Sequence, residues 1–170
     1  PIVVKGQTIE IVHVYPYLGN IIDDELTWTQ NTMKLYSKGQ QRMFFLRKLK
    51  SFNVNNTILK LFYQTVVQSV FTFCFILWFG NLTKENRNKL NKLVKWAQKI
   101  VGPGIDLASL QKMYCERVKI KVVSIMKDVN HPLYCEFKML PSGRRLSMPK
   151  IRTTRYRYCF VPNSIAIMNN

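Results

Sequence analysis

The chain has 170 residues, 47% of them apolar, so it can bury a core and is not a disordered tail. Lys and Arg number 26 against 9 Asp and Glu, which gives a formal net charge of +17. Self-repulsion of this size destabilises a compact state unless a polyanion neutralises it, so we expect a nucleic acid or an acidic membrane as partner.

The four cysteines are widely spaced and form no CxxC pair; they are Cys74, Cys115, Cys135 and Cys159. A small secreted chain would carry a denser disulfide framework, which favours a cytosolic or nuclear setting over secretion. Because the sequence starts at Pro1 and runs straight into strand-like residues, we interpret it as a piece of a longer protein.

Residues 1–28 show the pattern of short strands. Ile2–Val4 and Ile9–Val14 flank the turn Lys5-Gly6-Gln7, and a further apolar segment, Tyr17–Ile22, follows Pro16. We expect a small antiparallel hairpin or three-stranded piece. Alone it would be marginal, so it must lean on helices or on a sheet outside this sequence.

Residues 29–102 have helical periodicity and predict a helical bundle. In the first helix, which Thr27 or Thr29 can cap and which runs to about Ser51, some basic residues recur at every fourth position. Such spacing places them in one stripe. The stripe is Lys34, Lys38 and Arg42, and Arg47, Lys48 and Lys50 follow it. No acidic residue lies between Glu25 and Glu85, so this charge is unpaired in its own neighbourhood.

A second helix is expected from about Thr57 to Phe79, after an Asn-rich connector that can cap it. It carries no charge between Lys60 and Lys84, and its second half is almost wholly apolar. A membrane-spanning helix needs about 20 predominantly apolar residues, and the dense part here is roughly half as long. We therefore favour a buried core helix over a membrane span.

A third helix is capped by Thr83, reaches about Val101 and is stopped by Gly102-Pro103-Gly104. At about 100° per residue its apolar residues share one face, namely Leu90, Leu93, Val94, Ala97, Ile100 and Val101. Its lysines occupy the opposite face, namely Lys84, Lys92, Lys95 and Lys99.

Residues 103–137 predict a further helical region that Asp106 caps and that extends to about Asp128. Residues 138–170 predict a basic, largely irregular tail with a possible last short helix over 162–168. Aromatic residues interleave with the charge of this tail, whose arginines include Arg152, Arg155 and Arg157. Lys and Arg neutralise phosphates and aromatic faces stack on bases, so this combination favours nucleic acid.

No catalytic residue, cofactor site or metal site is predicted. Asp23-Asp24 at a strand end could hold Mg²⁺, but an ordinary polar turn before a helix explains the pair better. Cys115, His131, Cys135 and Cys159 are possible zinc ligands whose spacings are long and irregular.

Several motifs follow one another in an order that resembles LINE-type (non-LTR) retrotransposon reverse transcriptases. They are Tyr17-Leu18-Gly19, Ile22-Asp23 with Leu26-x-Trp28, the stretch 40–49, the stretch 62–69 with Leu77-Trp78-Phe79-Gly80, the stretches 90–93 and 97–102, His131-Pro132-Leu133, the stretch 140–145 and the ending from Arg152 onward. The resemblance covers nearly the whole chain.

This resemblance implies the thumb and C-terminal region of such an enzyme. Residues 1–28 would then end the polymerase palm, 29–102 would form the thumb-like bundle, 103–137 a C-terminal helical region and 138–170 the basic tail. The family's catalytic Tyr-x-Asp-Asp would lie upstream, so the fragment itself would not be an enzyme. Its expected partners are RNA and/or DNA and the polymerase palm of the parent protein.

A second resemblance involves the helix around Tyr36–Asn53. It is similar to a short, non-catalytic helical segment at the N-terminus of the AlkB-homologue-eight tRNA-modifying proteins, whose name carries dioxygenase and methyltransferase activities. The motifs of neither activity occur in this sequence.

The leading prediction is a mainly α fold with a small N-terminal antiparallel β-hairpin, a three- to four-helix bundle and a basic tail. Its function would be to grip template–primer RNA/DNA through the phosphates. The expected contacts are Lys34, Lys38, Arg42, Arg47 and Lys48, then Lys92, Lys95 and Lys99, then Arg152, Arg155 and Arg157. The alternatives are an AlkB-homologue-eight N-terminal-like segment, a basic protein on or anchored in a membrane, and a decayed element without function.

Overall fold

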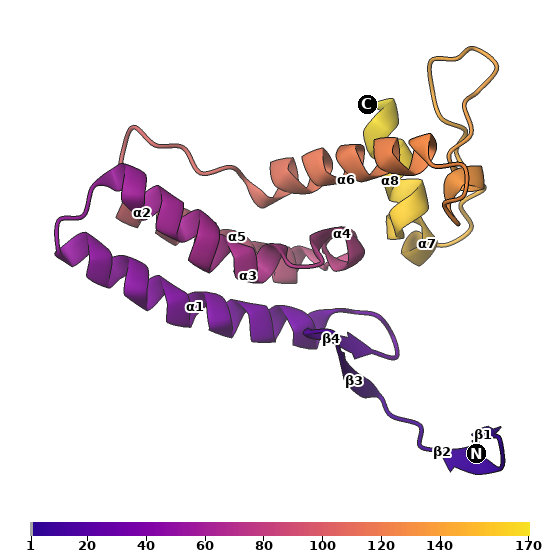
Figure 1. Cartoon of the computed structure of the whole chain (residues 1–170), viewed down its shortest axis with the longest axis horizontal. Helices are drawn as coiled ribbons and strands as arrows, with labels where there is room; N and C mark the ends of the chain where they lie inside the picture. Colours follow the sequence, from indigo (N-terminus) through magenta and orange to yellow (C-terminus); the bar gives the residue numbers. More distant parts are fainter. Residues whose placement is uncertain (1) are drawn as a thin grey trace.

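The computed structural model describes residues 2–170 and is mainly helical, with two small antiparallel hairpins at its N-terminus (Figure 1). The predicted fold class is therefore confirmed. The strands are β1 (Ile2–Val4), β2 (Gln7–Ile9), β3 (Val14–Tyr17) and β4 (Asn20–Asp23). The α-helices are α1 (Thr29–Ser51), α2 (Asn56–Phe62), α3 (Ser69–Thr72), α4 (Phe75–Trp78), α5 (Lys84–Val101), α6 (Leu110–Lys127), α7 (Thr154–Tyr158) and α8 (Phe160–Asn169). A π-helical segment η1 (Tyr63–Gln68) and two 3₁₀ turns, η2 (Phe79–Asn81) and η3 (Tyr134–Glu136), complete the list.

Each hairpin closes at a two-residue turn in which both residues have positive φ, namely Lys5-Gly6 and Leu18-Gly19. Such turns match the natural twist of paired strands. Consequently Gln7 belongs to β2 rather than to the turn, and residues 10–13, which the sequence placed in a strand, connect the two hairpins.

The first hairpin does not pack against the helices. Of the two supports expected for the N-terminal strands, helices or a sheet outside this sequence, the helices therefore do not support this hairpin. Every side chain of β1 and β2 is exposed, and the hairpin projects away from the helices (Figure 1). The second hairpin is attached, because the Ile21 N–H donates to Oδ1 of the buried Asn31 in α1 at 3.0 Å.

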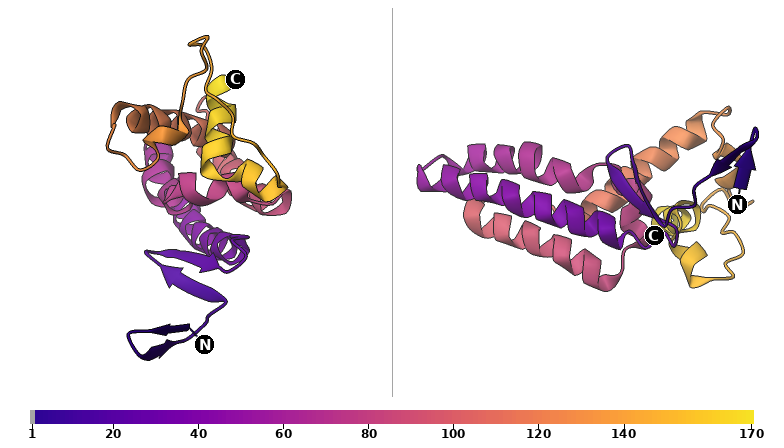
Figure 2. Two further views of the ribbon diagram at one scale, coloured as in Figure 1. Left: turned by 90° about the vertical axis from the view of Figure 1, so that its right-hand side faces the viewer. Right: turned by 90° about the horizontal axis from the view of Figure 1, so that it is seen from below.

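The segment from α2 to α3, α1 and α5 form one bundle (Figure 2). α1 and α5 run in the same direction, since the Asn86 side chain donates to the Thr29 hydroxyl at 3.1 Å near both N-termini. Midway along, Gly39 lets the helices approach: a Cβ at this position would lie 2.6 Å from Cδ1 of Leu93.

The central segment of the bundle buries every fourth residue from Leu59 to Phe75, namely Leu59, Tyr63, Val67, Phe71 and Phe75. In a regular α-helix every fourth residue advances by about 40° around the axis, so this repeat would soon leave the core. The wider π turn of η1 needs more residues per turn and compensates for the drift. The π turn thus keeps one face buried.

The single helix predicted over 57–79 is broken, which corrects that prediction. Phe73 is extended with a ψ of 131° and Cys74 is left-handed with a φ of 48°, while Trp78 Nε1 donates to the Phe73 carbonyl at 3.0 Å. The break turns Phe75 into an aromatic cluster with Trp78, Phe79 and Tyr114.

The broken segment is part of the core, as expected for a buried helix. Within the described residues no single helix has the length and apolar character of a membrane span. Only the two stretches Asn56–Thr72 and Phe75–Asn81 taken together have them, and they meet at a bend of 46°.

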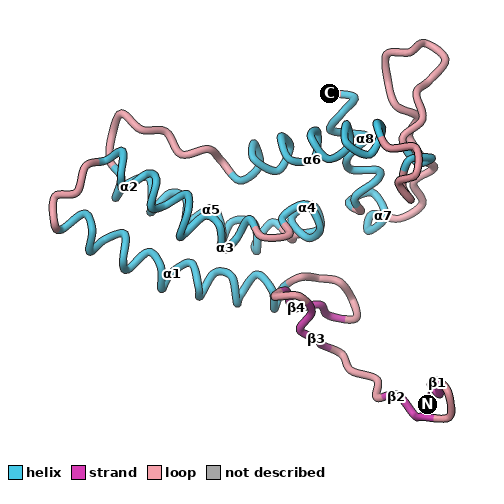
Figure 3. The backbone as a smooth tube through the Cα atoms, in the orientation of Figure 1, coloured by secondary structure: helices cyan, strands magenta, loops and turns pink. Residues whose placement is uncertain are grey.

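The C-terminal part packs on the other side of the aromatic cluster. α6 starts later than predicted, because the Ser109 hydroxyl rather than Asp106 accepts the capping hydrogen bond, from the Lys112 N–H at 3.2 Å. Long loops lead from α6 to α7 (Figure 3). The predicted last helix is present and longer than expected, and the Asn169 side chain bonds both the N–H and the carbonyl of Leu146. This clamp ties the loop to α8.

Candidate nucleic-acid interface

The adjacent aspartates before α1 serve the backbone of the turn. The buried Asp23 carboxylate accepts the Thr27 N–H at 2.7 Å and the Trp28 N–H at 3.0 Å. Asp23 thus supports the entry to α1, where Trp28 stands in the left-handed conformation and the Thr27 hydroxyl accepts the Thr29 N–H at 3.3 Å. Thr27 therefore assists, but neither predicted threonine is the N-cap residue.

Asp24 lies apart from this arrangement. Its Oδ2 is 2.7 Å from Nδ1 of His13, and both side chains are exposed. The hydrogen bond raises the pKa of His13 above its ordinary value and lowers the pKa of Asp24. Among residues 2–170, no three His, Cys, Asp or Glu side chains come together in a way that could hold a metal ion, and all four cysteines are free thiols.

The basic stripe of α1 divides into two kinds of residue. Lys34 and Arg42 are half-buried and turn toward the protein: Lys34 Nζ donates to the Gly19 carbonyl at 3.4 Å, and Arg42 Nη1 donates to the Val66 carbonyl at 2.6 Å. Lys38, in contrast, is exposed. The stripe therefore lies along the edge where α1 meets β4 and η1, rather than on the open face.

The Val66 carbonyl belongs to the π-helical turn, where it also accepts the Ser69 hydroxyl at 3.3 Å. The Arg42 guanidinium thus donates to the protein's own backbone and contributes to the fold. Arg47 and Lys48, one turn further along α1, are exposed and have no such role. Of the α1 candidates, Lys38, Arg47 and Lys48 remain free to meet a ligand.

The amphipathic pattern of α5 is confirmed by the structure. The six apolar residues of its predicted buried face are buried or half-buried, and Lys92, Lys95 and Lys99 are exposed on the opposite side. The Thr83 hydroxyl caps the helix by accepting the Asn86 N–H at 3.2 Å, and Gly102 ends it with a φ of 97°.

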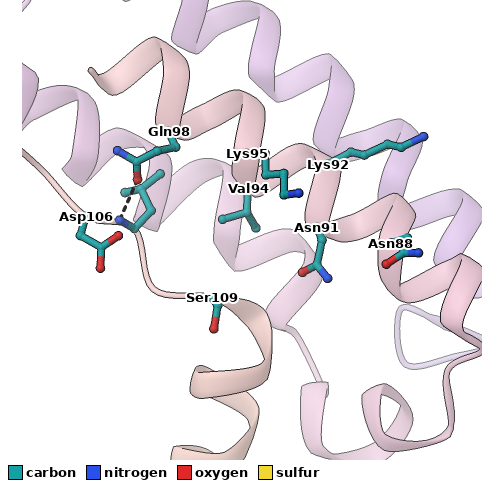
Figure 4. Close-up of a pocket in the computed structure, with 9 residues that line it drawn as sticks. Asn88, Asn91, Lys92, Val94, Lys95, Gln98, Asp106 and Ser109 are labelled. Carbon is teal, nitrogen blue, oxygen red and sulfur yellow. Dashed lines mark hydrogen bonds between the residues drawn. The ribbon is translucent and has the colours of Figure 1, made fainter. Parts of the chain in front are cut away.

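A cavity of about 600 Å³ with several polar lining residues lies between α5 and the start of α6 (Figure 4). Lys92 and Lys95 line it together with Asn88, Asn91 and Ser109. The Lys92 side chain extends along α5 away from Asp106, the carboxylate at the other end of the cavity (Figure 4).

The wall of this cavity is fixed by Gln98. Its Nε2 donates to the Ile105 carbonyl at 2.6 Å, and its Oε1 accepts the Leu107 N–H at 2.9 Å. The loop over 102–109 is therefore held against α5. The cavity offers amide, hydroxyl and ammonium groups, which suit the oxygens of a phosphate or sugar.

The three tail arginines predicted as contacts, Arg152, Arg155 and Arg157, are exposed and lie on α7 or just before it. α7 packs against η2. Arg155 lines a cavity of about 270 Å³ with Glu25 and Thr83, so it reaches the end of the bundle where α1 and α5 begin. Arg152 and Arg157 do not line this cavity.

Most of the positive charge has no partner. Among the described residues Lys89 is the one Lys or Arg side chain paired with a carboxylate, that of Glu85 at 2.9 Å. This pair lowers the pKa of Glu85. With 26 Lys and Arg against 9 Asp and Glu in the chain, most of the positive charge is not neutralised by a carboxylate of the described residues.

One feature of this surface is not among the residues predicted from the sequence. Trp96 of α5 is partly exposed, and its ring lies 6.5 Å from that of Tyr36 in α1, between ring centroids. The sequence does contain one signal for it, because Trp96 is a large aromatic residue among the lysines of α5. Its contact with Tyr36 depends on how two helices pack and leaves no trace in either helix alone.

Comparison with protein-family models finds a match to part of the chain. A family model described as "Alkylated DNA repair protein alkB homolog 8, N-terminal" matches residues 28–69, which covers α1, α2 and η1. The match contains the stretch Tyr36–Asn53 and confirms that resemblance. A search of curated proteins and a search of solved structures returned no match to this chain. The resemblance to a reverse transcriptase gains no support from these comparisons and rests on the residue motifs alone.

Proposed function

We propose that this chain is a non-catalytic nucleic-acid-binding module that holds a sugar–phosphate backbone against its basic helices. One observation carries the proposal: apart from Lys89, no Lys or Arg of the described residues has a carboxylate partner. A polyanion would relieve the repulsion among these charges, and releasing its condensed counterions would drive binding.

The helical pair of residues 28–69 gives this module its framework. That segment resembles the N-terminal part of a family whose name refers to the repair of alkylated DNA. The proposal assigns to it a binding role and no chemistry. α1 supplies exposed cations, and η1 holds Arg42 in place.

A template–primer grip, as in the thumb of a LINE-type reverse transcriptase, is the narrower form of the same proposal. It is favoured by the order of the motifs from Tyr17-Leu18-Gly19 to the C-terminal arginines. It predicts tighter binding to an RNA–DNA hybrid than to DNA or RNA duplexes of equal length. Equal affinity for all three duplexes would contradict the template–primer grip. It would remain compatible with nucleic-acid binding in general.

The general test is binding of the purified chain to duplexes at rising salt. A protein that makes 6–10 phosphate contacts loses about 10³- to 10⁵-fold in affinity between 50 and 200 mM salt. We expect a decline of this order. A flat dependence of log K on log salt would refute phosphate binding.

A triple variant locates the contacts. Replacing Lys92, Lys95 and Lys99 by Gln should make the salt slope shallower by up to about 3 units, because each phosphate contact contributes about 0.9. The matched control replaces three exposed lysines of α6, Lys112, Lys119 and Lys121, and removes the same net charge. Equal effects of both triple variants would show a general charge effect with no site on α5.

The membrane-surface alternative is tested in parallel with vesicles of anionic lipid. Strong flotation with such vesicles, together with no duplex binding, would replace the proposal by that alternative.

A further inference from the structure

Trp96 differs from the other two tryptophans of the chain in its exposure. Trp28 and Trp78 are 4% and 0% exposed, whereas Trp96 is 38% exposed. A large aromatic ring left partly in water on a basic helix has apolar area still to cover.

The ring of Trp96 has a fixed neighbour across the junction of α1 and α5. The Trp96 and Tyr36 rings are tilted by 49° with centroids 6.5 Å apart, and Gln40 Nε2 donates to the Tyr36 hydroxyl at 3.3 Å. The close approach of the helices at Gly39 and Leu93 lies about one turn from each ring. The two rings form a preorganised aromatic surface, which we call the Tyr36–Trp96 platform.

Cations flank the platform. Lys92 lies about one turn before Trp96 on α5 and Lys99 about one turn after it, and both are exposed. α5 contains one acidic residue, Glu85, which lies far along the helix and is paired with Lys89. Among the described residues no carboxylate pairs with either lysine, and Asp106 lies at the other end of the cavity from the Lys92 side chain (Figure 4).

We propose that the platform binds an unpaired base of a single-stranded nucleic acid. The base stacks on Trp96 while Lys92 and Lys99 hold the phosphates on either side of it. Aromatic side chains between cations are the usual device for single strands, since every base has a face to stack and a paired base does not expose it. This inference rests on the proposed function and adds to it a site that distinguishes single strands from duplexes.

The test uses Trp96 as its own reporter, because the other two tryptophans are buried. The intact chain is titrated with oligo(dT) and with an abasic deoxyribose-phosphate oligomer of equal length at one salt concentration. We expect oligo(dT) to quench the exposed tryptophan fluorescence and to bind more tightly, whereas the abasic oligomer binds without the same quenching.

Variants separate stacking from charge. Trp96→Ala should weaken oligo(dT) binding by about 5- to 150-fold, the usual loss of one stacked base, and should leave duplex affinity within about twofold. Trp96→Phe retains an aromatic face and should recover most of the binding. Circular dichroism checks the fold of both variants, and the comparison of the two oligomers needs no variant at all.

The outcomes are distinct. Equal affinity and equal quenching for both oligomers would overturn the stacking site while leaving phosphate binding intact. Steep salt dependence with duplex but no tryptophan response to oligo(dT) would do the same. Absence of binding to any of these polyanions would overturn the proposed function and this inference together.

Discussion

Arg42 is predicted to stabilise the fold rather than to bind a ligand. Replacing it tests whether the basic residues of α1 divide into structural and ligand-binding ones. In Arg42→Met the apolar stem is retained while the donor to the Val66 carbonyl is lost. The matched change is Lys48→Met on the same helix, which removes the same charge from an exposed position.

The expected magnitude follows from the geometry. A hydrogen bond from a charged donor contributes about 1.5–3 kcal/mol. Because Arg42 is only half-buried and the Ser69 hydroxyl also reaches this carbonyl, we expect a loss near the lower limit. For a chain of this length about 1.5 kcal/mol corresponds to a fall in Tm of roughly 3–6 °C. Lys48→Met should stay within about 0.5 kcal/mol of the parent chain.

Two assays on the same proteins test this division. Urea unfolding followed by circular dichroism measures the loss of stability. The salt dependence of duplex binding measures phosphate contacts, where Lys48→Met should lower the slope by up to about 0.9 and Arg42→Met by much less. The opposite pattern, with a stable Arg42→Met that loses one unit of slope, would refute the structural role.

Two further predictions concern two buried tyrosines and an exposed histidine. Tyr63 and Tyr114 are both buried, but no described residue bonds the Tyr63 hydroxyl, whereas Asn163 Nδ2 donates to that of Tyr114 at 2.8 Å. Burial raises the pKa of both. In thermal unfolding Tyr63→Phe should be neutral or stabilising by up to about 1 kcal/mol, and Tyr114→Phe destabilising by about 1–2 kcal/mol; equal losses would contradict this. NMR titration should find the pKa of His13 raised in the parent chain and returned toward its ordinary value in Asp24→Asn. The stabilisation from the raised pKa is fully present below the ordinary His value of about 6.5 and is lost as the pH rises through the raised value; a titration unaffected by Asp24→Asn would exclude the pair in solution.

The part of the fold that sequence could predict is the part in which local signals agree. α5 has a threonine cap, one continuous apolar face, an opposite row of lysines and a terminal glycine, and the structure follows all four. The exposure of Lys92, Lys95 and Lys99 follows from the same pattern.

The break at Phe73 and Cys74 could not be predicted, because the apolar residues on either side continue the same repeat of four. The repeat fits a helix in either form, and the contacts that accompany the break, such as that of Phe75 with Tyr114, are tertiary. The same holds for the site. The contact of Arg42 with Val66 and the tilt of Trp96 on Tyr36 are tertiary, so residue spacing cannot reveal them.

The common direction of α1 and α5 has an electrostatic consequence. Two helix macrodipoles point the same way, and the oppositely directed segment that starts with α2 cancels only one of them. The end of the bundle near Ser51 and Val101 thus carries an excess of partial negative charge, which already stabilises Lys48, Lys50 and Lys99 in the last turns. The opposite end is partially positive and adds to the charge of Lys84. At that end the same partial positive charge stabilises the carboxylate of Glu85 in the first turn of α5.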